Sequence, residues 1–386
     1  MLRSPQNFHT RTRIPFLGSE RPTLGVEVEV QIIDPHSWNL KQASVQLLER
    51  TGSPHIKQEL TQSTVEINTG ICENVQEAIE DLRHSFQLLF RAGEEVGCTF
   101  ACAGTHPFAN WRDQLIYPDE RYQMLVERIQ WPARRLLIYG LHVHVGISSG
   151  EKAIAVGNTL MNYLPHLLAL SASSPFAEFK DTGLASTRSK IFEAMPTAGL
   201  PYRLANYGEF QAFMNALIRA GAIQSIREIW WDLRPHTNFG TLEVRICDVM
   251  PTLRETAAIV ALIQSLIVWL DELYTEGIFL DQLRPWIIRE NKWRAARFGL
   301  AGDIIVDNLG TQANLQEEIV KLVETLVPVS RRLGCEQELQ YVEHILEHGA
   351  SYQRQREVYR QTGELAEVVQ SLVRELREDV LENKPR

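Results

Sequence analysis

The sequence has no excess of positive charge. Its 386 residues include 39 Lys and Arg against 48 Asp and Glu, which gives a net charge of −9. This balance argues against a nucleic-acid-binding protein, although it is compatible with a local basic pocket. With 44% hydrophobic and 23% charged residues the composition is that of a globular protein. The length suits one large domain or two ordinary ones.

Long hydrophobic runs are also lacking. The first 16 residues, MLRSPQNFHTRTRIPF, contain no apolar leader, so we expect no secretory signal. The most apolar stretch, Ala257 to Leu270, is shorter than the roughly 20 residues that a bilayer requires, and Gln264 interrupts it. We expect no membrane association. The stretch is predicted to be a buried helix, either in the core or, as in a homodimer, at an interface between subunits.

Cysteine is scarce. The five cysteines form no C-x-x-C pair and their number is odd, which favours free thiols and a cytoplasmic location. Cys98 and Cys102 are predicted to be small core residues.

Several catalytic motifs are missing. Residues Gly146–Lys152 resemble a phosphate-binding loop, but the segment is one residue short and Glu151 precedes the lysine, so it is predicted to be a turn leading into a helix. The sequence has no G-x-G-x-x-G, G-x-S-x-G or H-E-x-x-H motif, which weakly disfavours the corresponding enzyme classes.

Two predicted strands carry charged residues at alternate positions. Glu27 and Glu29 lie two residues apart in Gly25–Val30, as do Glu243 and Arg245 in Gly240–Ile246. Because side chains alternate between the faces of a strand, each pair shares a face, while valine, leucine and isoleucine cover the opposite one. A sheet with one apolar face and one carboxylate-lined face suits the binding of a hard cation such as Mg²⁺.

The remaining periodicity predicts an α+β protein with a mainly antiparallel sheet and helices packed on its apolar face. Asn74 with Glu77 is a predicted capping box for a helix that runs to about Val96. The polar loop Ser173–Tyr202 is too long for a passive connection and is predicted to be a lid or wall of the active site. Further strands are predicted at 24–33, 63–67, 98–103, 141–147 and 241–247, and further helices at 119–129, 151–171, 255–276, 315–326, 336–348, 352–362 and 364–378.

Four glutamates on predicted strands are candidate metal ligands: Glu27, Glu29, Glu66 and Glu243. Each could instead be a solvated surface charge, and for any one of them this is the simpler interpretation. As a set on one sheet face they would repel one another unless cations lay among them.

His142 and His144 share a face of the predicted strand 141–147. The spacing is compatible with zinc, but no cysteine or third histidine is evidently paired with them. Contact with phosphate or nucleotide suits an oxygen-rich Mg²⁺ site better, and a structural role for either histidine stays open.

Arginines supply groups that bind anions. Arg188 lies in the long loop, and Arg234 and Arg245 flank the late strand. Guanidinium groups bind carboxylate and phosphate through two parallel hydrogen bonds. Arg294 and Arg297 are by default surface ion-pairing residues.

Taken together, these segments resemble the carboxylate–amine ligases of the glutamate–cysteine ligase type 2 family. The segments that carry the resemblance are Thr23–Glu29, Val65–Asn68, Gly104–Phe108, Glu120–Tyr122, His142–Gly146, Ser171–Pro175, Trp231–Pro235, Phe239–Arg245 and Arg297–Leu300.

The resemblance implies a glutamine-synthetase-like sheet curved into a funnel. Residues 1–20 would form an N-terminal arm and 21–386 a single catalytic domain, with the sheet core at about 21–250 and a helical part at about 251–386. By analogy, Glu27, Glu29, Glu66 and Glu243 would bind Mg²⁺ or Mn²⁺, with Glu59 nearby. His142 or His144 would contact metal or nucleotide phosphate, Arg245 would hold the transferred phosphoryl group, and Arg188 would hold a carboxylate of the acid substrate.

The implied activity is ATP-dependent, ADP-forming amide synthesis through an acyl phosphate. L-Glutamate and L-cysteine would be the small-molecule substrates, giving γ-glutamylcysteine. Three alternatives stay open: another acid or amine, a non-catalytic nucleotide- or amino-acid-binding protein of the same fold, and phosphoryl transfer to a guanidine.

Overall fold

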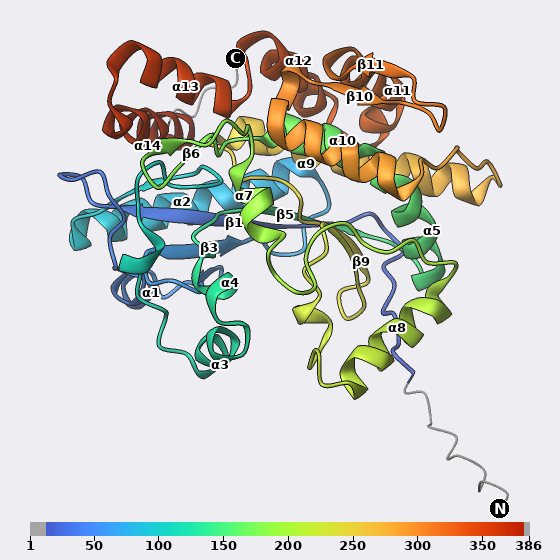
Figure 1. Ribbon diagram of the computed structural model, residues 1–386, viewed down its shortest axis with the longest axis horizontal. Coiled ribbons are helices and arrows are strands. Elements are labelled where there is room, and N and C mark those ends of the chain that lie inside the picture. Colours follow the sequence, from blue (N-terminus) through green and yellow to red (C-terminus); the bar gives the residue numbers. More distant parts are fainter. Residues whose placement is uncertain (1–12, 382–386) are drawn as a thin grey trace, which may run out of the picture.

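The computed structural model describes residues 13–381. Its centre is an antiparallel sheet in the order β2-β3-β1-β5-β9-β8, with β4 paired to the far end of β1. Figure 1 labels β1, β3, β5 and β9 of this sheet. The strands of this sheet are β1 (Leu24–Ile33), β2 (Ile56–Gln58), β3 (Thr64–Asn68), β4 (Thr99–Ala101), β5 (Leu141–Gly146), β8 (Leu233–His236) and β9 (Thr241–Val244). The predicted α+β architecture with a mainly antiparallel sheet is confirmed.

The register of the central strands brings the charged residues together. Glu29 is opposite Glu66 on β3, Glu27 is opposite His142 on β5, and His144 is opposite Glu243 on β9. Val26, Val28 and Val30 alternate with Glu27 and Glu29 along β1 and are buried in the core on its other face. The predicted alternation is therefore correct, and the charged face runs across four neighbouring strands.

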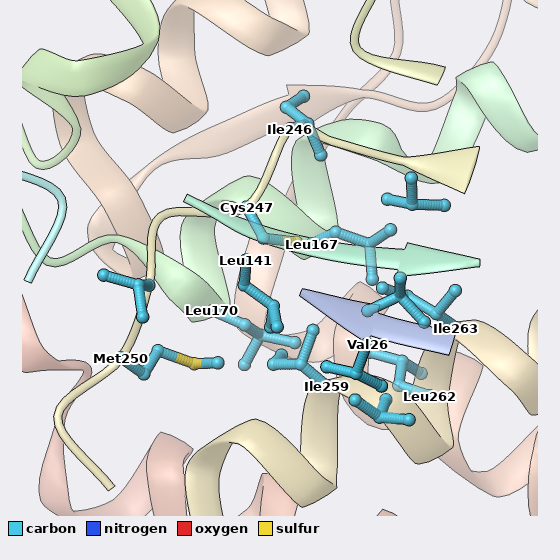
Figure 2. Close-up of a cluster of buried hydrophobic side chains, with 14 of the residues drawn as sticks. Val26, Leu141, Leu167, Leu170, Ile246, Cys247, Met250, Ile259, Leu262 and Ile263 are labelled. Carbon is cyan, nitrogen blue, oxygen red and sulfur yellow. The ribbon is translucent and has the colours of Figure 1, made fainter. Parts of the chain in front are cut away.

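Helices cover the apolar face. Figure 2 shows Val26 of β1 and Leu141 of β5 packed against Ile259, Leu262 and Ile263 of the helix α9 (Leu253–Thr275). The other helices of the first two thirds of the chain are α1 (Ser44–Thr51), α2 (Val75–Val96), α3 (Glu120–Ile129), α4 (Trp131–Arg134), α5 (Gly150–Leu160), α6 (Leu164–Ser171), α7 (Thr187–Phe192) and α8 (Tyr207–Arg219). The predicted cap of α2 is present, because the Asn74 side chain accepts a hydrogen bond from the Glu77 amide.

The helix α9 is long and apolar enough to cross a membrane by length and composition alone, but most of it is buried inside the protein. It packs against the sheet and against α2, α5, α11 and α12. Of the two predicted settings for this segment, the structure therefore supports the core helix.

The last third of the chain is nearly all helix, as predicted. In Figure 1 these orange-to-red helices form a layer on one side of the sheet, while α3, α4 and α8 lie on the other. The elements are α10 (Pro285–Phe298), the short strands β10 (Asp303–Ile305) and β11 (Gln312–Asn314), α11 (Leu315–Leu333), α12 (Glu336–His348), α13 (Ser351–Thr362) and α14 (Leu365–Leu381).

Three local predictions were wrong. The helix expected at 151–171 is divided into α5 and α6, because Pro165 lacks an amide hydrogen and favours the first turn of a new helix. The strand expected at 98–103 is only three residues long. The loop expected at 173–202 contains a small hairpin, β6 (Phe176–Ala177) with β7 (Lys180–Asp181), followed by α7.

Part of the proposed N-terminal arm, residues 1–12, lies outside the described residues. The next residues follow the protein surface: the Leu17 amide donates to the Thr237 carbonyl at 2.9 Å, and the Phe16 ring packs edge-on against Tyr207. The boundary at residue 20 stays a prediction. All five cysteines are buried and free, as expected.

Candidate active site

A cavity of about 470 Å³ lies over the charged face of the sheet. Its floor includes Glu27, Glu29, Glu66 and His142, and its walls come from α3, α7 and the segment 224–230. The segment 173–202, which was predicted to be a lid or wall of the active site, therefore contributes part of the cavity wall through α7.

Glu27 is at the centre of this floor. Its carboxylate lies 3.1 Å from Nδ1 of His142 and 3.5 Å from Nε2 of His144. Burial raises the pKa of Glu27, but hydrogen bonds from the two imidazoles outweigh that effect and hold the pKa well below its ordinary value. The carboxylate on β1 therefore meets both histidines of β5.

Glu29, Glu66 and Glu59 form a cluster of carboxylates beside Glu27, with an oxygen of each within 4.8 Å of the others. Burial raises the pKa of Glu29 and of Glu59 to about 7, and that of Glu66 well above its ordinary value; the neighbouring negative charges add to the rise. Carboxylates crowded in this way are stabilised by a cation.

The donor atoms fit a divalent metal. Besides the all-oxygen set of Glu29, Glu59 and Glu66, two sets share Glu27: one with Glu66 and His142, the other with His144 and Glu243. Oxygen-only ligation suits Mg²⁺, and the sets that include a histidine also suit Mn²⁺.

Glu243 has a second role that the sequence did not reveal. Its side chain is fully buried between two guanidinium groups, that of Arg234 at 2.7 Å and that of Arg245. Burial raises the pKa of Glu243, but the two arginines outweigh it and hold the pKa far below its ordinary value. Glu243 is therefore the shared counter-ion of two guanidinium groups, whether or not it also binds metal.

Arg245 and Arg188 both line the cavity. Arg245 follows the last residue of β9 and is buried against Glu243. Arg188 lies on α7, not in an irregular loop as predicted, and its guanidinium donates to the backbone carbonyls of Ile246 and Arg245, each at 3.2 Å. The two guanidinium groups face the same space as the carboxylate cluster.

Some lining residues were not predicted. Arg121 and Arg128 reach the cavity from α3, and Lys57 reaches it from β2. The ring of Phe239, on the β8–β9 turn, stacks at 4.0 Å on that of His236, the last residue of β8. Only Arg121 and Phe239 belong to segments that carried the family resemblance, so the sequence offered no local pattern that pointed to the others.

Arg294 and Arg297 are not among the residues that line the cavity. Arg294 pairs with Glu290 one turn away on α10, and Arg297 donates to the Gly183 carbonyl. For Arg294 the expected surface ion pair is confirmed.

Comparison with known proteins identifies the family. Residues 23–371 match the model of the glutamate–cysteine ligase family 2. A protein of Thermobifida fusca named "Putative glutamate–cysteine ligase 2" is 47% identical over 371 residues, covering 94% of this chain and 93% of its own. A similarly named protein of Rhodococcus jostii is 45% identical, covering 94% and 99%.

Solved structures show the same fold at low sequence identity. The glutamate–cysteine ligase of Francisella tularensis, determined in complex with AMP, superposes with a TM-score of 0.70 at 14% identity, covering 96% of this chain and 91% of that one. A bifunctional glutathione synthetase of Pasteurella multocida gives 0.66 at 16% identity, covering 94% and 53%. The match of the family model over most of the sequence, together with these relatives, shows that the chain belongs to the glutamate–cysteine ligase family 2.

Proposed function

We propose that the protein joins a carboxylic acid to an amine with hydrolysis of ATP to ADP and phosphate. The observation that carries this proposal is the meeting, in one cavity, of a half-buried carboxylate cluster that fits divalent metal with the guanidinium groups of Arg188 and Arg245. Cations of both kinds are what a phosphoryl transfer between two anions requires.

A carboxylate is a poor electrophile, and its phosphorylation activates it towards attack by an amine. An oxygen of the substrate carboxylate attacks the γ-phosphorus of ATP, the bond from that phosphorus to the bridging oxygen breaks, and ADP leaves. The amine nitrogen then attacks the carbonyl carbon of the acyl phosphate, loses a proton and expels phosphate, leaving the amide. Bound metal would supply charge neutralisation for the phosphates.

The residues of this chain would position these groups. Glu27, Glu29, Glu66 and Glu243, with Glu59, would hold Mg²⁺ or Mn²⁺, and His142 and His144 would lie beside the nucleotide phosphates. Arg245 would bind the transferred phosphoryl group, and Arg188 a carboxylate of the acid. The AMP in the complex of the Francisella structure supports a nucleotide site on this fold.

The substrates we propose are L-glutamate and L-cysteine, giving γ-glutamylcysteine, on the strength of the relatives' names. None of the lining residues above is specific for a thiol, so another amine is the second candidate.

We further propose a cytoplasmic protein without nucleic-acid or membrane partners, and a homodimer. Because α9 is a core helix, its apolar surface no longer favours a dimer. Light scattering at micromolar concentration measures the oligomeric state, and a monomer mass would refute the homodimer.

A screen of ATP with pairs of amino acids tests the reaction. We expect ADP and phosphate to appear only when acid and amine are both present with Mg²⁺, and EDTA to stop their release. AMP and pyrophosphate as products would refute the acyl-phosphate route. ATP binding without turnover for any pair would favour a binding protein, and a phosphorylated guanidine product would favour the kinase alternative.

A further inference from the structure

A carboxylate that the proposed reaction does not use lies directly behind Arg188. Asp248 is fully buried, four residues after the end of β9, and it does not line the cavity. A buried carboxylate is costly unless it is paired and hydrogen-bonded, so its partners indicate what it is for.

All the partners of Asp248 belong to the segment that carries Arg188. The Ser173 amide donates to Oδ2 at 3.0 Å, the Ser174 hydroxyl donates to the same oxygen at 2.6 Å, and the Ser186 hydroxyl donates to Oδ1 at 2.8 Å. Nη1 of Arg188 itself lies 3.9 Å from Oδ1. One carboxylate therefore fixes both ends of the small hairpin and the start of α7.

Ser174 and Ser186 pass the constraint on to α7, the helix that carries Arg188. The Ser174 oxygen, whose hydrogen is given to Asp248, accepts a hydrogen bond from the Arg188 amide at 3.1 Å. Ser186 caps α7 and accepts from the Ser189 amide at 3.3 Å. The backbone of Arg188 is thus tied to Asp248 through a single hydroxyl.

The guanidinium is held from the other side by the segment that leads to Asp248. It donates to the carbonyls of Arg245 and Ile246, which lie three and two residues before Asp248 in the chain. Gly140 leaves room for it, because a Cβ at that position would lie 2.2 Å from Nη2. Asp248 in turn fills its space closely, since a Cβ on Gly104 would lie 2.6 Å from its carboxyl group.

We propose that Asp248 is a positioning residue that holds the Arg188 guanidinium in place to receive the substrate carboxylate. The inference rests on the proposed function for the identity of that ligand. Asp248 does not touch the substrate and acts through Arg188 alone. A misplacement of about 1 Å in a binding group can cost roughly a hundredfold in rate, so the loss of this support is measurable.

A double-mutant cycle tests the proposal. Asp248→Asn replaces one acceptor oxygen by an NH2 group that only donates, so the Ser173 amide and the hydroxyls of Ser174 and Ser186 can no longer all donate to this side chain as they do now. We expect Asp248→Asn to raise KM for the acid substrate about tenfold or more while KM for ATP stays the same. Arg188→Ala should raise the same KM further, and the double variant should be no worse than Arg188→Ala, because residues that act through one contact are not additive. Additive effects would overturn the proposal.

Two further variants separate positioning from general stability. Asp379 is a matched control: it is also buried, it accepts from the amide of Leu253 at the start of α9, and it lies outside the cavity. Asp379→Asn should lower the melting temperature and leave KM for the acid unchanged. If Asp248→Asn does not fold, Ser174→Ala, which removes only the hydroxyl between Asp248 and Arg188, takes its place in the cycle.

A crystal structure of Asp248→Asn or Ser174→Ala tests the inference without any turnover. Displacement of the Arg188 guanidinium from the carbonyls of Arg245 and Ile246 supports it, and an unmoved guanidinium overturns it. Absence of ligase activity in the unsubstituted protein would instead refute the proposed function, while the crystal structure would still decide the role of Asp248.

Discussion

At the scale of single residues, Glu27 is the most informative position to change, because two of the three candidate metal-binding sets include it. We expect Glu27→Gln to lower turnover roughly a hundredfold or more. The folded protein should persist, because removal of one charge from a cluster of carboxylates relieves repulsion. ADP release with Mg²⁺ and a thermal melt measure the two effects.

Glu255→Gln is the matched control for Glu27. Glu255 is a buried carboxylate that pairs with Arg354 at 2.8 Å, away from the residues that line the cavity. Glu255→Gln should lower the melting temperature and leave the rate of the folded protein unchanged. A near-normal rate for Glu27→Gln would show that the metal assignment is wrong.

Glu243→Gln should behave differently from Glu27→Gln. It would leave the buried guanidinium groups of Arg234 and Arg245 without their shared carboxylate. Breaking a buried ion pair from one side costs about 3–5 kcal/mol, so this variant should lose stability as well as activity. Urea unfolding of the two variants in parallel makes the comparison, and equal stability would contradict the counter-ion role.

The alternation of side chains along a strand explains why these glutamates could be predicted. Period two places Glu27 and Glu29 on one face whatever the rest of the fold. Arg128 on α3 reaches the cavity because the chain folds back over the sheet, and Lys57 reaches it because β2 pairs with β3 and places Lys57 opposite Glu66. Neither position follows from alternation alone. Likewise, the pairing of Glu243 with Arg234 depends on the β8–β9 register.

At the scale of elements, most central strands and several long helices followed from periodicity and capping, but α8 and α10 were not predicted, and neither was the structure of the segment 173–202. Its helix α7 is only six residues long and is held by partners distant in sequence. The amides of Ala185 and Ser186 donate to the Ala296 carbonyl on α10, and Arg356 on α13 pairs with Asp181. Tertiary contacts therefore decide the conformation of this segment, and local sequence carries little of that information.

Lys292 on α10 is a further tether, and it is buried. Its buried ammonium lies 2.5 Å from Asp232 and 2.7 Å from Glu193, the residue that follows α7. Burial lowers its pKa, but the two carboxylates outweigh that effect and raise it above the ordinary value. We expect Lys292→Met to lower the free energy of unfolding by about 3–5 kcal/mol, measured by urea titration.

Lys321→Met provides the contrast for Lys292→Met, because Lys321 pairs with Glu318 on the exposed surface of α11. It should leave the urea midpoint unchanged. If both variants unfold at the same urea concentration, the tether between α10 and α7 contributes nothing to stability.

At the scale of the whole molecule, stability should depend on pH through buried histidines such as His106. Its Nδ1 accepts from the amides of Phe108 and Ala109, and its Nε2 donates to the Trp38 carbonyl. Burial lowers the pKa of His106 from 6.5 to about 4. Because the unfolded chain takes up the proton first, the stabilisation is complete above pH 6.5 and is lost as the pH falls towards 4.

The carboxylates of the cavity have the opposite effect over part of this range. Burial raises the pKa values of Glu29 and Glu59 to about 7, so these groups bind protons in the folded state at a higher pH than in the unfolded chain. Their protonation therefore stabilises the folded protein as the pH falls from 7. The histidine contribution is therefore isolated by comparing the protein with His106→Gln, not from the total pH profile. Between pH 7 and pH 4 the variant should lose roughly 3 kcal/mol less unfolding free energy than the parent. Urea titrations at several pH values in EDTA measure this difference, and parallel profiles would show that His106 is already protonated or exposed in the folded protein.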